Sequence, residues 1–137
     1  AAPYVLTIGA TNVPWLIDGA ILSRLGAKLI QVPLPDAEAR SAILALQLEQ
    51  AGHRSQVPVE DLMAQTEGYS GREIADMCQE AIGRMLGRAN PTLLAAADQL
   101  RVAPRTGSDF EYALTRVRPG TTPAYLERLD AWRAAQE

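Results

Sequence analysis

The chain has few residues of the kinds that form disulfides and metal sites. It contains 1 cysteine and 1 histidine in 137 residues. The lone Cys78 excludes an internal disulfide and is compatible with a reducing compartment. His53 has no cysteine or second histidine beside it in the sequence, so we expect no metal site.

The chain has neither a large excess of charge of one sign nor a long apolar run. Lys and Arg number 13 against 16 Asp and Glu, which gives a net charge of -3. That balance, without a basic stripe, argues against a nucleic-acid partner. No apolar stretch reaches about 18 residues, and no charged-then-apolar leader opens the chain. We therefore expect a soluble, cytoplasmic protein without direct membrane insertion.

Apolar residues are abundant enough to form a core. They make up 47% of the 137 residues, which suffices for one or two small subdomains. Two uncharged or nearly uncharged runs, residues 4–9 and 28–34, have the composition of strands buried in a parallel sheet. Pro33 and Pro35 end the second run.

Helical patterns fill the rest of the chain. We expect helices over residues 18–24, 37–50, 59–66, 72–88, 91–100, 109–117 and 124–136. Four of them begin beside a residue that favours the N-cap position, namely Asp18, Asp36, Ser70 and Ser108. Ser70 belongs to the tight turn GYSG at residues 68–71.

Other segments receive simpler interpretations. Gly52 is predicted to stop the helix at 37–50, and residues 101–107 are predicted to be a Pro/Arg/Gly linker. We expect Trp15 to anchor the first short helix against the sheet. Trp132 lies on an apolar face of the last helix that favours self-docking or a contact between subunits.

Asn12 directly follows the first predicted strand. In open α/β sheets ligands bind at the carboxyl ends of the strands, and an amide there can hold a water or a phosphate oxygen without carrying charge. Asparagine after a strand is also a common turn former. The residues alone leave both interpretations open.

Motifs along the chain resemble, in order, the second half of the AAA ATPase core. They are GATN at residues 9–12, PLPD at 33–36, TEGYSGREIADMCQEA at 66–81 and DFEYAL at 109–114. Pro14–Trp15 followed by Ile17–Asp18 is most similar to the branch that contains katanin, spastin and the ESCRT-disassembling ATPase, or to a prokaryotic relative. This resemblance implies an α/β remnant, two strands of a parallel AAA sheet, over residues 1–35. An all-helical lid with a C-terminal helix would follow over residues 36–137.

The resemblance assigns catalytic roles to Asn12 and Arg24. Asn12 matches sensor 1, which orients the attacking water or contacts the γ-phosphate. Arg24 stands where the family has an arginine finger that acts on a neighbouring subunit's nucleotide. The branch usually has two adjacent arginines, and Ser23 replaces the first of them here. The alternative for Arg24 is a solvated cation favoured by the helix dipole.

The lid residues would bind the nucleotide. By position, Ile43 would pack on the adenine, Gln47 would occupy a place usually held by histidine, and Gly71 would let the backbone approach the ring. Arg72 resembles the sensor-2 arginine of more distant AAA+ proteins, at a helix start that favours phosphate. Its alternative is a surface arginine paired with Glu73 or Asp76.

Two parts of a complete ATP site are missing from the sequence. There is no G-x-x-x-x-G-K-[ST] phosphate loop and no acidic pair ending a Mg²⁺-binding strand. We expect ATP or ADP as the ligand, with Mg²⁺ bound outside this chain, and no hydrolysis by the chain alone. The resemblance implies a piece of a hexameric ring ATPase that remodels or disassembles protein substrates.

The alternative is a non-catalytic assembly or regulatory module that contributes in trans to a partner's ATP site. In either case the two strands would need a cover. We expect them to pair with the missing half, to swap with a second copy or to pack in a dimer.

Overall fold

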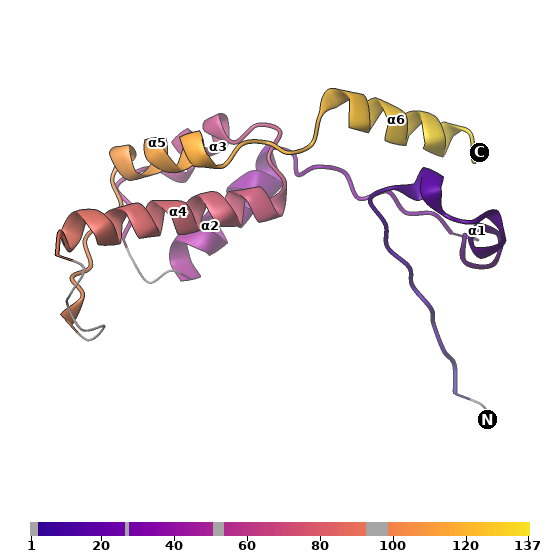
Figure 1. Ribbon diagram of the computed structural model, residues 1–137, viewed down its shortest axis with the longest axis horizontal. Coiled ribbons are helices and arrows are strands. Elements are labelled where there is room, and N and C mark those ends of the chain that lie inside the picture. Colours follow the sequence, from indigo (N-terminus) through magenta and orange to yellow (C-terminus); the bar gives the residue numbers. More distant parts are fainter. Residues whose placement is uncertain (1–2, 27, 51–53, 93–98) are drawn as a thin grey trace. The chain divides into compact units, whose positions relative to one another are not determined.

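The structure, a computed structural model, describes residues 3–26, 28–50, 54–92 and 99–137. Contacts divide the chain into two compact units, Ala1–Pro33 with Thr122–Glu137 and Leu34–Thr121. In chain order the helices are η1 (Pro14–Leu16), α1 (Gly19–Leu25), α2 (Ala37–Gln50), α3 (Val59–Gln65), α4 (Gly71–Ala89), α5 (Gly107–Arg116) and α6 (Pro123–Ala134), as Figure 1 shows.

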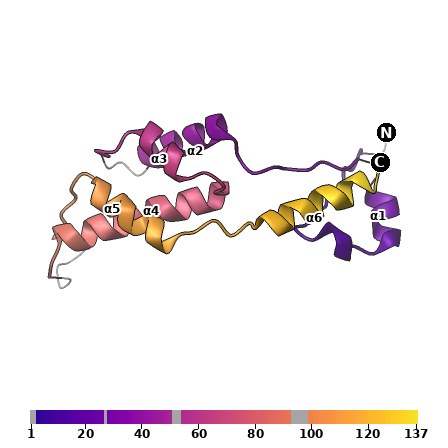
Figure 2. The same ribbon diagram turned by 90° about the horizontal axis from the view of Figure 1, so that it is seen from above.

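The unit Leu34–Thr121 is a helical bundle centred on α4. Helices α2 and α5 both pack against α4, and α3 packs against α2. Helices α4 and α5 lie side by side in both views (Figures 1 and 2). The core consists of apolar side chains from all four helices and the turn before α4, namely Leu44, Leu62, Tyr69, Ile74, Met77, Cys78, Ala81, Phe110 and Ala113. The spacing of the α4 residues places them on one helix face, as predicted.

Side-chain caps begin three helices where the sequence predicts them. Asp18 Oδ1 accepts a hydrogen bond from Ala20 N at 2.8 Å, and Asp36 Oδ1 accepts one from Ala39 N at 2.8 Å. At α4, Ser70 Oγ accepts from Glu73 N at 3.3 Å, and Glu73 Oε2 accepts from Ser70 N at 2.7 Å. This reciprocal capping box satisfies backbone N–H groups that have no partner inside the helix.

Helix α5 begins at Gly107, one residue before the predicted cap, so the prediction for Ser108 is wrong. Its N-cap is Thr106. The Thr106 main-chain N and Oγ1 donate to Asp109 Oδ2 at 2.9 and 3.1 Å. Thr106 therefore caps the helix in place of Ser108, because the carboxylate of Asp109, three positions later, accepts hydrogen bonds from it.

The segment predicted as a linker, residues 101–107, is mostly exposed but contains one fully buried residue, Arg105. Arg105 is fully buried and forms an isolated parallel bridge with Ser55. Its guanidinium donates from Nη2 to the Leu48 main-chain O at 3.2 Å and lies 5.8 Å from the centre of the Phe110 ring. A buried arginine that cross-links two loops and a helix end gives this segment a structural role rather than a connecting one.

In the other unit, α6 packs against η1. The Trp15 and Tyr125 rings meet edge to face, with centroids 5.8 Å apart. Trp15 thus packs on α6, not on a sheet as we expected. The domain division that places the last helix in the lid stays a prediction, whereas the contacts group α6 with residues 1–33.

The segments predicted as strands form no β-ladder in the described part of the chain, and Figure 1 draws them as plain traces. Ile8 and Ile30 are 81% and 75% exposed. A strand is held by hydrogen bonds to neighbouring strands, and the described residues do not supply those neighbours. The helical lid is confirmed, and the strands at residues 4–9 and 28–34 are corrected to unpaired segments.

Some predictions fall on residues outside the described ranges. They concern Gly52, His53 and the middle of the helix at 91–100, residues 93–98. Within the described ranges, none of the helices combines the length and the hydropathy needed to cross a lipid bilayer.

Candidate functional site

Asn12 lies in the turn before η1, and its main chain is held while its side chain is not. Its carbonyl O accepts a hydrogen bond from Tyr125 Oη at 2.5 Å. The residue is exposed, and its amide has no hydrogen-bond partner among the described residues. The side chain is therefore available to a ligand.

Arg24 lies in the last turn of α1 and is exposed. It has no hydrogen-bond or ion-pair partner in the part of the chain that the structure describes. A cation at this end of a helix is favoured by the dipole. The geometry therefore agrees with an arginine finger and equally with a solvated helix-end cation.

The predicted adenine contacts lie where α2 meets the start of α4. A Cβ built on Gly71, the first residue of α4, would lie 3.6 Å from Ile43 Cδ1. Gln47 is half-buried and follows Ile43 by one helical turn, which places both on the same face of α2. The structure thus brings Ile43 and Gly71 together, with Gln47 beside Ile43.

Arg72 is paired with a surface carboxylate. Its Nε lies 3.7 Å from Asp76 Oδ2, and the two side chains are 90% and 57% exposed. An exposed pair one turn apart contributes at most about 0.5 kcal/mol, so an anionic ligand could displace Asp76 at little cost.

Glu73 does not pair with Arg72 but ties α4 to the segment after α5. Its Oε1 accepts from Gly120 N at 2.6 Å, while Oε2 accepts from Ser70 N. Burial tends to raise the pKa of Glu73, but the hydrogen bonds from Ser70 and Gly120 outweigh it and leave the pKa below its ordinary value. Glu73 is therefore ionised at the positive end of α4.

Tyr69 provides a second tie between the same two segments. Its ring is buried, and its hydroxyl donates to the Val117 main-chain O. Burial raises the pKa of Tyr69, with Arg118 opposing the shift. Sequence reasoning missed both ties because residues 69–73 and 117–120 are far apart in the chain.

The single thiol carries no reactivity. Cys78 is buried on the inner face of α4. Burial raises its pKa to about 11, although the Arg105 charge opposes the shift. The thiol therefore stays protonated at neutral pH and behaves as an apolar core residue.

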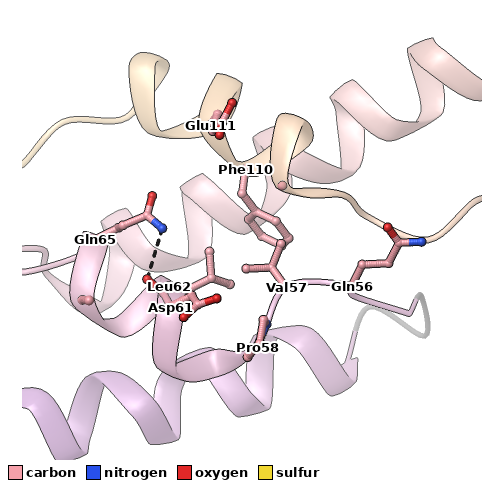
Figure 3. A pocket seen from close by; sticks show the side chains of 10 residues that line it. Gln56, Val57, Pro58, Asp61, Leu62, Gln65, Phe110 and Glu111 are labelled. Carbon is pink, nitrogen blue, oxygen red and sulfur yellow. Dashed lines mark hydrogen bonds between the residues drawn. The ribbon is translucent and has the colours of Figure 1, made fainter.

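A pocket of about 580 Å³ opens between α3 and the start of α5 (Figure 3). Its lining includes the acidic side chains of Asp61 and Glu111 and the apolar side chains of Leu62 and Phe110. Gln65 Nε2 donates to the Asp61 main-chain O at 3.2 Å. The lining contains none of the residues predicted to contact a nucleotide, so it is a separate feature of the lid.

The motif order and the capped helical bundle together define the C-terminal portion of an AAA ATPase module. No protein-family model matches the chain. Its sequence is 34% identical over 134 residues to the A1 form of the katanin p60 ATPase-containing subunit from Arabidopsis thaliana, covering 93% of this chain and 25% of that protein. It is 33% identical over 133 residues to the human A-like 1 form of the katanin p60 ATPase-containing subunit, covering 93% and 27%.

Solved structures agree with the sequence relatives. The FIGL-1 AAA domain in complex with ADP aligns with a TM-score of 0.72 and 31% identity over 93% of this chain and 43% of that one. A structure that describes katanin self-assembly aligns with a TM-score of 0.77 and 31% identity over 89% and 44%. The chain is therefore homologous to the C-terminal portion of katanin-like AAA ATPases, as predicted. It spans about a quarter of the length of the curated relatives named above.

Proposed function

We propose that this chain is the sensor-1, arginine-finger and lid portion of a ring-forming AAA ATPase. The whole protein would couple ATP hydrolysis to the remodelling or disassembly of protein substrates. The observation that carries the proposal is the match, by sequence and by fold, of 93% of the chain to the AAA domains of katanin and FIGL-1. Mg²⁺ and part of the phosphate site would be bound outside this chain, which alone would not hydrolyse ATP.

In this proposal Asn12 contacts the attacking water or the γ-phosphate. An amide suits the role because it hydrogen bonds in both directions without adding charge. Its side chain is exposed and has no hydrogen-bond partner among the described residues. Loss of a pre-positioned hydrogen-bonding group of this kind lowers rates by roughly 10²-fold.

Arg24 would act on the nucleotide of the neighbouring subunit. A guanidinium inserted in trans stabilises the charge that develops on the phosphoryl oxygens, an effect of ~10³ or more in rate. The exposed position of Arg24 at the end of α1, without a partner in the described ranges, leaves its guanidinium accessible to a neighbouring subunit.

The adenine would lie against Ile43, Gln47 and Gly71. Only a glycine leaves the backbone open at the start of α4, where Ile43 Cδ1 already lies 3.6 Å from the position of a Cβ. Arg72 would leave Asp76 for the phosphates. The ADP bound to the FIGL-1 AAA domain supports a nucleotide as the ligand, and lower nucleotide affinity of Arg72→Ala would support the role of Arg72.

Mixing of two variants tests the proposal. In the whole protein, Asn12→Ala and Arg24→Ala should each lower ATP turnover, and Arg101→Ala should not. Arg101 is a suitable control because it is exposed and its hydrogen bonds to Asn90 involve only its main chain. In a ring assembled at random from equal amounts of the two variants, about one interface in four would combine an intact Asn12 with an intact Arg24 of the neighbouring subunit. About a quarter of the activity should therefore return.

The outcomes separate the candidate functions. Recovery on mixing would support sites shared between subunits. Normal turnover by Arg24→Ala would contradict the finger assignment. If the whole protein hydrolysed no ATP but stimulated a partner ATPase, the assembly or regulatory module would be the better description.

A further inference from the structure

We propose that Tyr125 is a positioning residue that orients Asn12 from the C-terminal helix. This inference rests on the proposed function, because it concerns the hydrogen-bonding direction of the residue that would contact the nucleotide. The contact joins residues 113 positions apart in the chain. Nothing in the sequence pattern indicates it.

Both polar groups of the peptide that follows Asn12 are bound by side chains. On one side, Tyr125 Oη donates to the Asn12 carbonyl O at 2.5 Å. On the other, Val13 N donates to Thr11 Oγ1 at 3.0 Å. A planar peptide held at its C=O and its N–H cannot rotate without breaking a hydrogen bond. The backbone that carries the Asn12 amide is therefore fixed at its carboxyl side.

The phenol ring is itself held in place. The Tyr125 ring meets Trp15 edge to face at 5.8 Å, and the Arg128 guanidinium lies 4.1 Å from the Trp15 ring centre. The Tyr125 main-chain N donates to Thr122 Oγ1 at 3.2 Å, at the cap of α6. A hydroxyl on a ring fixed by these contacts loses little conformational freedom when it binds the carbonyl.

A second contact joins α6 to another part of the same unit. Gln31 Nε2 donates to Asp130 Oδ1 at 3.1 Å. Together with the Trp15 contact, this exposed hydrogen bond should keep α6 docked when the Tyr125 hydroxyl is removed. Removal of that single oxygen therefore isolates its effect on Asn12 from the docking of the helix.

Steady-state ATP hydrolysis by the whole protein tests the inference. Tyr125→Phe keeps the ring and should lower kcat by about 3- to 10-fold, the effect of one lost hydrogen bond, with the KM for ATP and the Tm nearly unchanged. The control is Tyr112→Phe, since the Tyr112 ring packs on Arg84 while its hydroxyl has no hydrogen-bond partner among the described residues. This control should leave kcat unchanged.

A double mutant separates positioning from other roles. If Tyr125 acts through Asn12, Tyr125→Phe should have no further effect in an Asn12→Ala background, measured by single-turnover hydrolysis because the rates are low. Two results would overturn the positioning role alone. One is that Tyr125→Phe lowers the hydrolysis rate equally in the wild-type and Asn12→Ala backgrounds. The other is that Tyr125→Phe leaves the wild-type rate unchanged while Asn12→Ala lowers it. A normal rate for Asn12→Ala would overturn the proposed function of Asn12 and the inference that depends on it.

Discussion

The guanidinium of Arg88 binds the buried carboxylate of Asp109 through two hydrogen bonds, from Nε to Oδ1 at 3.3 Å and from Nη2 to Oδ2 at 2.9 Å. Asp109 Oδ2 also accepts from Thr106 at the start of α5. Burial tends to raise the pKa of Asp109, but the bonds from Arg88 and Thr106 outweigh it and lower the pKa. One carboxylate thus joins the end of α4 to the beginning of α5.

Replacement of Asp109 should destabilise the lid. Asp109→Ala removes a fully buried acceptor and the reciprocal cap of α5, so the free energy of unfolding should fall by about 2–4 kcal/mol. Asp76→Ala, which removes only the exposed partner of Arg72, should change it by less than about 0.5 kcal/mol. Urea unfolding followed by circular dichroism measures both. Equal losses in the two variants would contradict a special role for Asp109.

Acid should weaken the fold through Asp109 and Glu73. Both carboxyl groups have a lowered pKa in the folded protein. Their contribution to stability is complete above the ordinary values of 3.8 and 4.5 and is lost as the pH falls through the lower folded values. The free energy of unfolding, measured in urea between neutral pH and acid, should therefore decline below about pH 4.5. Glu73→Gln should show a shallower decline, and an unchanged slope would contradict the role of Glu73.

Cys78 should resist thiol reagents in the folded protein. With a pKa of about 11, almost no thiolate is present at pH 8, and the sulfur is also buried. Ellman's reagent should react at a rate set by unfolding, and promptly once urea is added. Rapid labelling of the native protein would show that α4 opens far more readily than its packing indicates.

Two glycines of α4 offer a matched comparison. Within the described ranges, and apart from its chain neighbours and its own helix backbone, Gly83 has nothing within 4 Å of the place that an added methyl group would take. Gly71 has Ile43 Cδ1 at 3.6 Å, an ordinary van der Waals distance, so the fold accommodates alanine at both. Gly83→Ala should stabilise the helix by about 0.5–1 kcal/mol without affecting nucleotide affinity. Gly71→Ala should weaken binding of ADP by the whole protein, as measured by calorimetry. Equal affinities would remove Gly71 from the adenine site.

Local features were predictable from the sequence because local hydrogen bonds decide them. Asp18, Asp36 and Ser70 cap their helices through atoms at most three residues away. The buried face of α4 follows equally from helical periodicity, which places Ile74 and Met77 one turn apart. Both kinds of inference need only a short window of sequence.

Features that depend on distant atoms were not predictable. Arg105 is buried and contacts the Leu48 main-chain O and the Phe110 ring, and a Pro/Arg/Gly composition gives no sign of that environment. The unpaired segments at 4–9 and 28–34 have strand composition, but pairing depends on neighbouring strands. In the candidate site, the pairing of Ile43 with Gly71 follows from the family resemblance, while the contact of Tyr125 with Asn12 required the structure.

The apolar side chains that stand in water at Ile8 and Ile30 have a calorimetric consequence. Removal of apolar surface from water lowers the heat capacity by roughly 0.45 cal/K/mol for each Å² covered. Any association that covers these two segments therefore becomes more exothermic as the temperature rises. The slope of its enthalpy against temperature would report how much of this surface is covered.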